Sequence, residues 1–277
     1  MSYPRTPDRA PQDAPDPPRR VPAGLDDYAG DRQFATTLAR GMELLRCFTP
    51  DEPLLGNKDL SRRLGLPPAT ITRLTYTLVA MGYLAQESPQ GRYRLGSAVL
   101  ALGFPLLQMF EIRRRARPLM LELAQATGAA VSIGIRDRFS IVYIEAVRAR
   151  PMRRYPLDIG TSHSLAGSAI GRAWLMGCSP QERQALLNRL RLRAPQEWER
   201  HRVELLRNVR EFPRHGCCVS VGELYPDVVA VAVPLGRIDQ GELAALNCSF
   251  QRRAPDRAWL LQEAGPRLQA LAAALTA

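Results

Sequence analysis

Lysine is almost absent from this sequence, histidine is rare, and no long apolar run occurs. Lys58 is the only lysine among 38 basic residues in a chain of 277, so arginine carries nearly all of the positive charge. No apolar stretch approaches the ~20 residues that a membrane-spanning helix needs, and the N-terminus lacks the apolar segment of a secretory signal. We therefore expect a cytoplasmic protein with no membrane partner.

Metal sites and disulfides are not indicated either. The five cysteines include no Cys-x-x-Cys pair, and the three histidines do not fall at metal-ligand spacing with them. Without a secretory signal, buried reduced thiols are the expected state. The adjacent Cys217 and Cys218 would point to opposite faces of a strand, so a disulfide between them is not expected.

Catalytic motifs are also missing. The sequence has no nucleophile elbow, phosphate-binding loop or dinucleotide fingerprint. The groups available for a thiol–imidazole pair or for paired carboxylates are His163, His215, Cys217, Cys218, Glu145 and Glu223. No third group is in place to orient a thiol–imidazole pair, and single glutamates at strand ends are usually exposed. We therefore predict a protein that is not an enzyme and needs no cofactor or metal; a thiol-dependent enzyme is the less favoured alternative.

The sequence does contain an excess of positive charge and enough apolar residues for two domains. The net charge is +11, which favours a polyanionic partner, and 45% of the residues are hydrophobic. Residues 1–31 hold seven prolines and no periodic pattern, which predicts a disordered tail. The rest of the chain divides into a small domain over 32–95, a connecting helix over 96–111 and a larger domain over 112–277.

Residues 57–95 have the pattern of a winged helix-turn-helix. Asn57 is expected to cap a helix over 58–64, which Gly65 ends in a left-handed turn. A second helix follows Pro67 and Pro68, with a buried stripe formed by Ile71, Leu74, Leu78 and Met81. Strands over 83–85 and 92–95 then flank a turn over 88–91. Ahead of this motif, a first helix is predicted with one shared face made of Leu38, Met42, Leu45 and Phe48.

The polar side of the second helix has the properties of a DNA-recognition surface. Short hydroxyls and one arginine near the helix start can reach phosphates and base edges in the major groove. The residues left on this side are Thr70, Thr72, Arg73, Tyr76 and Thr77. Arg92 and Arg94 in the hairpin would place charge near the flanking backbone or the minor groove. The alternative interpretation is an ordinary solvated helix face.

The part after the hairpin predicts a connecting helix and an α+β domain. The helix over 97–108 is too apolar to lie exposed, which suggests that it forms a dimer. Helices are expected over 112–127, 168–176, 180–191, 197–212 and 257–276, and strands over 130–135, 140–145, 217–219, 228–234 and 243–250. Hairpin strands with helices grouped between them favour an antiparallel sheet.

Several segments, in their order and spacing, resemble the isocitrate-lyase-regulator (IclR) family of bacterial transcription regulators. The resemblance runs from about residue 39 to the C-terminus and rests on ARGMELLRCF, LSRRLGLPPATITRL, MGYL, GRYRLGSAVLALG, ELAQATGAAVSI, IVYIEAV, GSAIGRAWL, VGELYPDVVAVAVPL and LAALNCSF. It implies a winged helix domain, a dimerising connector helix and a sensor domain with a profilin- or GAF-like sheet. It also implies dimers or dimers of dimers, with a small organic acid or aromatic metabolite that tunes transcription.

The resemblance also implies two sets of site residues. DNA-reading positions fall on Thr70, Thr72, Arg73, Tyr76 and Arg92, and the predicted DNA-binding set further includes Lys58 and Arg62. The effector pocket would lie between one loop and the strands of the last part. The loop side comprises Thr161, Ser162, His163, Ser164, Ala166 and Ser168, and the facing side comprises Cys218, Ser220, Glu223, Ala230, Asn247 and Ser249.

The same pocket can be argued from the residues alone. A hydroxyl-rich segment leads into a helix N-terminus near Ser168, where free backbone N–H groups favour a carboxylate, and His163 could add a charge-assisted bond. The alternative is that Ser168 merely caps its helix and His163 is a solvated loop residue. We predict a regulator that binds double-stranded operator DNA and responds to a carboxylic or aromatic acid. An architectural DNA-binding protein without a ligand is the alternative.

Overall fold

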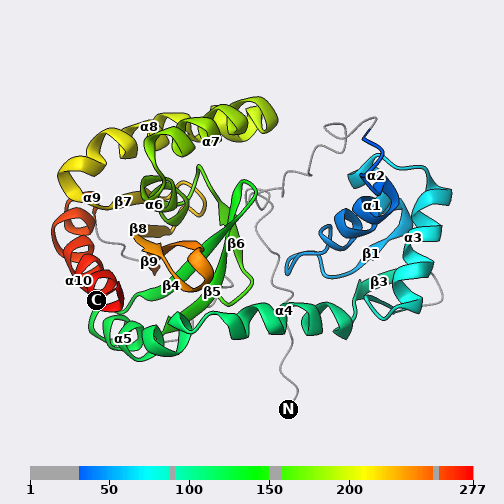
Figure 1. Ribbon diagram of the computed structural model, residues 1–277, viewed down its shortest axis with the longest axis horizontal. Coiled ribbons are helices and arrows are strands. Elements are labelled where there is room, and N and C mark those ends of the chain that lie inside the picture. Colours follow the sequence, from blue (N-terminus) through cyan, green and yellow to red (C-terminus); the bar gives the residue numbers. More distant parts are fainter. Residues whose placement is uncertain (1–30, 88–90, 150–156, 252–255, 277) are drawn as a thin grey trace, which may run out of the picture.

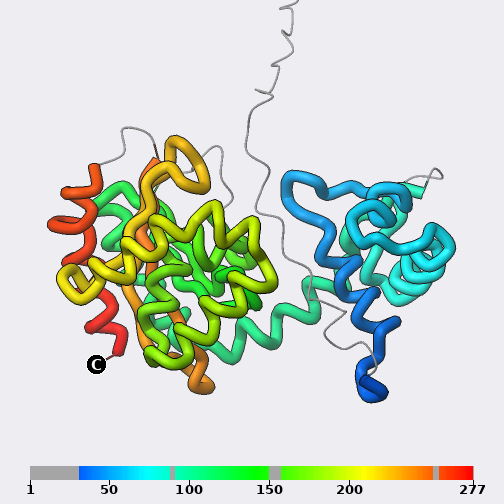
Figure 2. Tube along the Cα trace, turned by 90° about the horizontal axis from the view of Figure 1, so that it is seen from above, coloured from blue at the N-terminus to red at the C-terminus, as the bar shows by residue number. Residues whose placement is uncertain are grey.

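The computed structural model describes residues 31–87, 91–149, 157–251 and 256–276, and it forms two bodies joined by a long helix (Figure 1). We call residues 31–96 the N-terminal body and residues 110–276 the C-terminal body. Figure 2 shows the two bodies side by side, with the connecting helix running from one to the other. The predicted tail over 1–31 lies outside the described residues except for Asp31.

The N-terminal body is a winged helix-turn-helix. Its elements are α1 (Thr36–Leu45), β1 (Leu55–Gly56), α2 (Asn57–Leu64), α3 (Pro68–Ala80), β2 (Leu84–Gln86) and β3 (Arg92–Leu95). The three strands form an antiparallel sheet in the order β1-β3-β2. Gly65 ends α2 in the left-handed conformation, as predicted. The turn expected over 88–91 lies outside the described residues except for Gly91.

The predicted cap of α2 is wrong. Asn57 is the first residue of the helix itself, and the N-cap position belongs to Gly56. The Asp59 carboxylate accepts a hydrogen bond from the Gly56 backbone N–H at 3.1 Å. The Asn57 amide turns instead towards α3 and donates to the Thr72 hydroxyl at 3.4 Å. The Asn57 side chain, which the local pattern assigned to capping α2, therefore forms a tertiary contact with α3 instead.

The buried face of α1 also differs from the prediction. Leu38 and Met42 are 66% and 47% exposed, whereas Leu44 is completely buried. Gly41 is also buried and faces α3, where a side chain at this position would be in ordinary contact with Leu74, 3.9 Å away. Phe48 is buried, although it follows the end of the helix. The predicted face was therefore rotated away from the one that packs.

The buried stripe of α3 is mostly as expected. Its fully or nearly buried residues are Ile71, Leu74, Thr75 and Leu78. Met81 lies just after the helix and is 59% exposed, so its assignment to the stripe is wrong. The hydroxyl of Thr75 can be buried at little cost because it donates to the Ile71 carbonyl at 3.0 Å.

The C-terminal body is built on a six-stranded antiparallel sheet in the order β6-β5-β4-β9-β8-β7. The strands are β4 (Ala130–Asp137), β5 (Ser140–Arg148), β6 (Ser162–Ser164), β7 (Cys218–Val221), β8 (Val228–Arg237) and β9 (Leu243–Gln251). The helices are α5 (Ile112–Thr127), α6 (Ala169–Gly177), α7 (Pro180–Arg193), α8 (Pro195–His215), α9 (Arg257–Trp259) and α10 (Gly265–Thr276). The predicted α+β class is confirmed, and β1 and β6 are additional to the predicted strands.

Helices cover both faces of this sheet, so it has two cores. Met120 of α5 and Leu268 of α10 belong to one core, and Trp174 of α6 and Leu205 of α8 belong to the other. Figure 1 shows α5 and α10 on the side opposite α6, α7 and α8. Cys217 packs into the first core and Cys218 into the second, in agreement with the predicted alternation. All five cysteines are free.

The connecting helix α4 (Ser97–Met109) has no buried residue. Its exposed apolar side chains are Leu100, Leu102, Phe104, Leu106 and Met109. Gly96 precedes it at a tight junction, since a side chain there would lie 2.1 Å from the Gly82 carbonyl oxygen. No helix in the described part of the chain is long and apolar enough to cross a membrane.

Candidate functional sites

The outer side of α3 presents a polar surface to solvent. Thr72, Arg73, Tyr76 and Thr77 are exposed, and Tyr76 is 77% exposed. Thr70 is partly buried. The Thr72 and Thr77 hydroxyls donate to the Pro68 and Arg73 carbonyls at 3.0 Å and 2.9 Å, so their oxygens keep free acceptor positions. Among the described residues, none pairs with the side chain of Arg73.

Three further basic residues flank this surface. Lys58 is exposed on α2, and Arg62 is exposed while forming a 3.3 Å ion pair with Asp59. Arg92 of β3 is exposed and donates to the Leu54 carbonyl at 3.1 Å. An ion pair this exposed contributes little, so Arg62 can exchange Asp59 for a phosphate. Basic and hydroxyl side chains on α2, α3 and the wing could therefore bind one polyanion together.

A cavity lies in the C-terminal body between the sheet, the start of α6 and the segment after β7. It is lined by Tyr143, Leu157, His163, Ser168, Ala169, Ile170, Ser220, Leu224, Tyr225, Val228, Ala230, Asn247 and Ser249. Its volume is about 40 Å³, which is room for about three waters. Within the described part of the chain, no arginine, lysine, aspartate or glutamate lines it.

Half of the residues predicted for an effector pocket line this cavity. They are His163, Ser168, Ser220, Ala230, Asn247 and Ser249, whereas Thr161, Ser162, Ser164, Ala166, Cys218 and Glu223 do not line it. Ser164 is occupied elsewhere, because its hydroxyl bonds Glu197 and accepts from the Gly167 N–H at 2.7 Å. Cys218 and Ser220 lie two apart on β7 and so share a face, but Cys218 packs into the core around α6.

The prediction missed seven lining residues. They are Tyr143, Leu157, Ala169, Ile170, Leu224, Tyr225 and Val228. Strand alternation was an available signal for Val228, which lies two residues before Ala230 on β8. Tyr143 and the segment after β7 gave no local signal, because only the packing of distant strands brings them to the cavity.

Three polar atoms around the cavity are buried and have no hydrogen-bond partner among the residues that the structure describes. They are His163 Nε2, Asn247 Oδ1 and Ser249 Oγ. The Asn247 amide nitrogen donates to the Tyr143 hydroxyl at 3.2 Å, and the Tyr143 and His163 ring centres lie 4.7 Å apart. A buried polar atom without a partner costs about 1–3 kcal/mol. These atoms therefore favour a polar occupant.

The start of α6 adds a second attraction for such an occupant. Ser168 is the N-cap, since its hydroxyl accepts from the Gly171 N–H at 3.0 Å, and it also donates to the Ser164 carbonyl at 2.5 Å. Ser168 therefore does cap its helix, as the alternative interpretation held. Ala169 and Ile170, in the first turn, line the cavity. Free N–H groups in the first turn of a helix favour a negative charge.

His163 is not the solvated loop residue of the alternative interpretation. It is the central residue of β6, pairs with Ile141 and is 6% exposed. Burial lowers the pKa of its imidazole from 6.5 to about 4. The side chain is therefore neutral at pH 7, and it would meet a ligand with an ordinary hydrogen bond rather than the charge-assisted bond expected from the sequence.

Acidification is expected to destabilise the C-terminal body partly through His163. The folded pKa of about 4 is lower than the ordinary 6.5, so between these values the unfolded chain binds more protons. The stabilising contribution of neutral His163 is fully present above pH 6.5 and is lost as the pH falls towards 4. Between pH 7 and pH 5 the free energy of unfolding should fall by about 2 kcal/mol through this group. Urea unfolding at both pH values should give a smaller loss for His163→Gln than for the wild type. Identical losses would contradict this role. Burial also lowers the pKa of His201. Because His201 is present in both the wild type and the His163→Gln variant, its effect cancels in this comparison.

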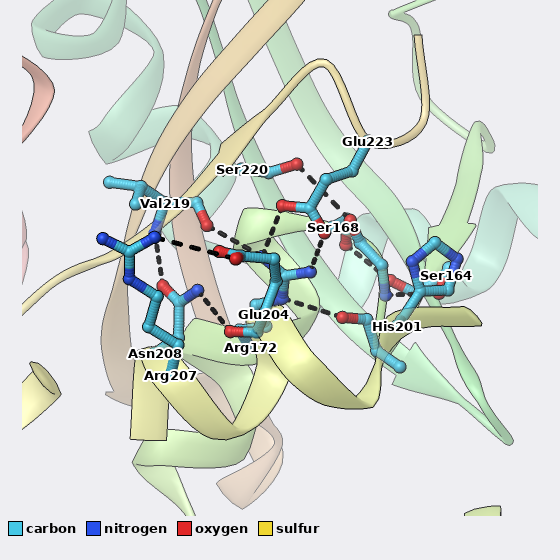
Figure 3. A network of polar contacts seen from close by, with 12 residues as sticks. Ser164, Ser168, Arg172, His201, Glu204, Arg207, Asn208, Val219, Ser220 and Glu223 are labelled. Carbon is cyan, nitrogen blue, oxygen red and sulfur yellow. Dashed lines mark hydrogen bonds and ion pairs between the residues drawn. The ribbon is translucent and has the colours of Figure 1, made fainter. Parts of the chain in front are cut away.

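Arg172 ties α6 to the segment that closes the cavity (Figure 3). Its side chain is completely buried, and its Nε donates to the Ala166 carbonyl at 2.8 Å. One Nη donates to the Val219 carbonyl at 2.9 Å and to Glu223 at 2.8 Å, and the other bonds the second Glu223 oxygen. Glu223 directly precedes the lining residue Leu224. The ion pair therefore fixes this wall of the cavity.

The predicted catalytic alternatives find no support in this geometry. Cys217 and Cys218 are buried, and burial raises the pKa of Cys217 to about 11 and that of Cys218 further still. Both thiols are therefore protonated at pH 7. Glu145 was expected to be an exposed carboxylate at a strand end, but its side chain is only 2% exposed. Its two carboxylate oxygens lie 3.3 Å from a guanidinium nitrogen of Arg113 and 2.7 Å from one of Arg117. In the described part of the chain, no cluster of potential metal ligands occurs.

Two family models match the chain. The model of the bacterial transcriptional regulator IclR C-terminal domain matches residues 104–277, which is more than half of the chain. The model of the IclR helix-turn-helix domain matches residues 37–88. The two matches fall on the C-terminal body and on the winged helix-turn-helix.

Individual relatives agree with the family models. The HTH-type transcriptional regulator TsaQ1/TsaQ2 of Comamonas testosteroni is 37% identical over 205 residues, covering 72% of this chain and 73% of that protein. An IclR family transcriptional regulator from Brucella abortus has a crystal structure with a TM-score of 0.81 and 41% identity, covering 92% of this chain and 97% of its own. An IclR homolog of Microbacterium hydrocarbonoxydans, complexed with 4-hydroxybenzoate, shares the fold at a TM-score of 0.60 and 20% identity, over 86% of this chain and 99% of its own.

Proposed function

We propose, from the premise that this chain belongs to the IclR family of bacterial transcriptional regulators, that a small carboxylic acid bound in the C-terminal body sets its affinity for operator DNA. In this proposal residues 32–95 bind DNA, residues 96–111 connect and dimerise, and residues 112–277 bind the effector. The protein acts in the cytoplasm, where its DNA target and a metabolic acid are both present.

The observation that carries the effector part is the cavity at the start of α6. It combines three unpartnered polar atoms, those of His163, Asn247 and Ser249, with the first turn of a helix. The lining residues that the structure describes carry no side-chain charge that would repel a carboxylate. An architectural protein without a ligand would have no use for such orphaned groups, which cost stability until something bonds them.

The size of the cavity bears on which acid it binds. A volume of about 40 Å³ suits an acid of a few heavy atoms without rearrangement. An aromatic acid such as 4-hydroxybenzoate, the ligand of the Microbacterium homolog, would require Leu224 and Tyr225 to move outwards. We therefore propose that the cavity recognises a carboxylate group, and the chain or ring attached to this group is what the experiment below varies.

A thermal-shift series tests the effector site. Short-chain and aromatic carboxylic acids are added to the full chain, and a binder at 100 times its Kd stabilises the native state by about 2.7 kcal/mol. Asn247→Leu removes the amide and should abolish the shift. The matched control is Asn188→Leu, at an exposed position on α7, and it should retain the full shift. If both variants respond alike, the acid binds elsewhere.

Arg73 is proposed as a base-reading residue. Its unpaired and exposed guanidinium lies on the side of α3 opposite the buried Ile71, Leu74 and Leu78. If it binds guanine with two hydrogen bonds, Arg73→Ala should cost about 1–3 kcal/mol on an operator selected from random duplexes. Binding to non-selected duplex should weaken less. Arg191→Ala, an equal change of charge on the exposed part of α7, is the control. Equal losses on both duplexes would indicate a phosphate contact instead.

Dimerisation through α4 is the third part of the proposal. The helix exposes five large apolar side chains and buries none of its residues within the chain. Contiguous exposed apolar surface of this kind usually marks an interface. A two-fold dimer through α4 would present two α3 helices to half-sites about one helical turn, or a multiple of it, apart. A dimer of dimers would extend the same arrangement.

A further inference from the structure

Among the described residues, two ion pairs connect the N-terminal and C-terminal bodies directly. Arg138, at the turn between β4 and β5, contacts Glu43 of α1 at 2.6 Å. Asp137, beside it, accepts two hydrogen bonds from Arg46, the C-cap residue directly after α1, at 2.9 Å and 3.3 Å. Glu43 and Arg46 lie three residues apart, so they share a face of the helix. We call these four residues the tip clamp.

The tip clamp is better shielded than an ordinary surface ion pair. The Glu43 side chain is 7% exposed, and the other three side chains are between 30% and 35% exposed. The Arg46–Asp137 contact uses two guanidinium nitrogens and both carboxylate oxygens, the geometry that makes arginine–carboxylate pairs strongest. Each body supplies one acid and one base, so neither body can keep the same pairings once the two separate.

The turn that carries Asp137 and Arg138 is held from behind by the cavity-forming helix. Arg138 has a φ of 56°, the left-handed conformation that a two-residue turn requires. Arg136 donates to the Arg138 carbonyl at 3.0 Å, and its guanidinium stacks 5.1 Å from the ring centre of Trp174 in α6. Arg136 therefore links α6 directly to the turn.

Continuous contacts lead from the turn to both functional surfaces. On one side, the Phe139 carbonyl accepts from the Leu165 N–H at 2.9 Å, and β5 runs on to the cavity residue Tyr143. On the other side, α1 packs against the recognition helix α3 through Leu44, which shares the core of the N-terminal body with Ile71 and Leu74. The tip clamp is thus the point where these two sets of contacts meet.

A second approach between the two bodies involves the cavity residue Tyr225. Tyr225 lines the cavity, and its pKa is raised first by burial and then by the negative charge of Asp51. Asp51 belongs to the segment between α1 and β1, and so to the N-terminal body. Tyr225, on this side of the cavity, therefore lies within electrostatic range of the segment between α1 and β1.

We propose that the tip clamp is an interdomain docking surface, whose partner is the C-terminal body of the same chain, and that it fixes the orientation of the recognition helix according to what fills the cavity. The second half of this statement rests on the proposed function. A ligand can act through the clamp only if it binds one arrangement of the two bodies more tightly than another. Covalent connection through α4 alone would leave the N-terminal body free to rotate about its end.

Charge reversal with rescue tests the docking without DNA or ligand. Arg46→Asp and Asp137→Arg should each separate the bodies, seen as a larger radius of gyration in small-angle scattering and as at least about tenfold faster amide exchange around the turn over 136–140. The double variant restores the opposite charges and should return both readouts to the wild-type values. Glu43→Lys with Arg138→Glu forms an independent second cycle at the more buried pair.

The matched control is Arg202→Glu, which reverses a charge paired with Glu199 on the exposed side of α8, away from the turn. It should change neither readout. Single reversals that leave scattering and exchange as in the wild type, or double variants without rescue, would overturn the docking surface.

The regulatory half is measured afterwards with a selected operator duplex and with acetate as the probe acid, because its few heavy atoms fit the cavity as it stands. Single reversals should retain the thermal shift by the acid and lose most of its effect on operator affinity. A normal effect of the acid on operator binding in separated bodies would overturn the coupling. Loss of the thermal shift in the wild type would instead reject the proposed acid site and leave the docking result intact.

Discussion

Replacing Glu223 with alanine is expected to lower the free energy of unfolding of the C-terminal body by about 3–5 kcal/mol. The change leaves the guanidinium of Arg172 completely buried with two carbonyl partners and no counter-charge. An uncompensated charge in a low-dielectric interior is far more costly than the loss of the pair itself. The segment carrying Leu224 and Tyr225 should loosen as well, because its anchor is lost.

Urea unfolding followed by tryptophan fluorescence measures this effect selectively, because all three tryptophans lie in the C-terminal body. Removing both partners, as in Arg172→Met with Glu223→Ala, should recover most of the loss, since no charge stays buried. Glu199→Ala, which breaks an exposed pair with Arg202, should cost less than about 1 kcal/mol. A Glu223→Ala loss as small as that of Glu199→Ala would show that Arg172 finds solvent or another partner.

Placing charge on α4 is expected to have the largest effect on DNA binding. Leu100 and Phe104 lie four residues apart and share a helix face, and they are 76% and 59% exposed. Aspartate at both positions should dissociate a dimer formed by this face, because two like charges would then be buried at its centre. Loss of the second half-site contact should lower operator affinity by about 10²–10⁴-fold.

Sedimentation and operator titration of the same samples measure both consequences together. Leu192 on α7 has the same 76% exposure as Leu100, so Leu192→Asp is the matched control and should leave assembly and affinity unchanged. The α4 variants should unfold at the same urea concentration as the wild type if the monomer is intact. A charged α4 variant that still forms dimers and binds operator fully would place the dimer interface on another surface.

The N-terminal body was predictable from local patterns to a large extent. The spacing of Ile71, Leu74 and Leu78 identifies the buried side of α3, and Gly65 identifies the end of α2. Each of these signals acts within one or two helical turns, so neighbouring residues carry it. The errors arise where a tertiary contact overrides the pattern. Asn57 turns to α3 instead of capping α2, and Met42 lies on the side of α1 that no element covers.

The cavity was predictable only in part. The family resemblance assigned hydroxyl and amide side chains in β7, β9 and the segment before α6 to the pocket, and several of them line the cavity. The resemblance also assigned Ser164 and Glu223 to it, and their polar groups are already bonded to Glu197 and Arg172. A sequence shows that a side chain can form hydrogen bonds, but it does not show which partner takes them.

The sequence by itself determined the winged helix-turn-helix, the apolar connecting helix and the α+β class, because these depend on periodicity and on turn residues within short segments. Tertiary structure alone decided the burial of Arg172 against Glu223, the orphaned atoms of the cavity and the clamp between the two bodies. The pairs involved are 51 residues apart for Arg172 and Glu223, 91 for Arg46 and Asp137, and 104 for Tyr143 and Asn247. No local preference reaches over such distances, and only the closure of the sheet and its docking on α1 brings these groups within bonding range.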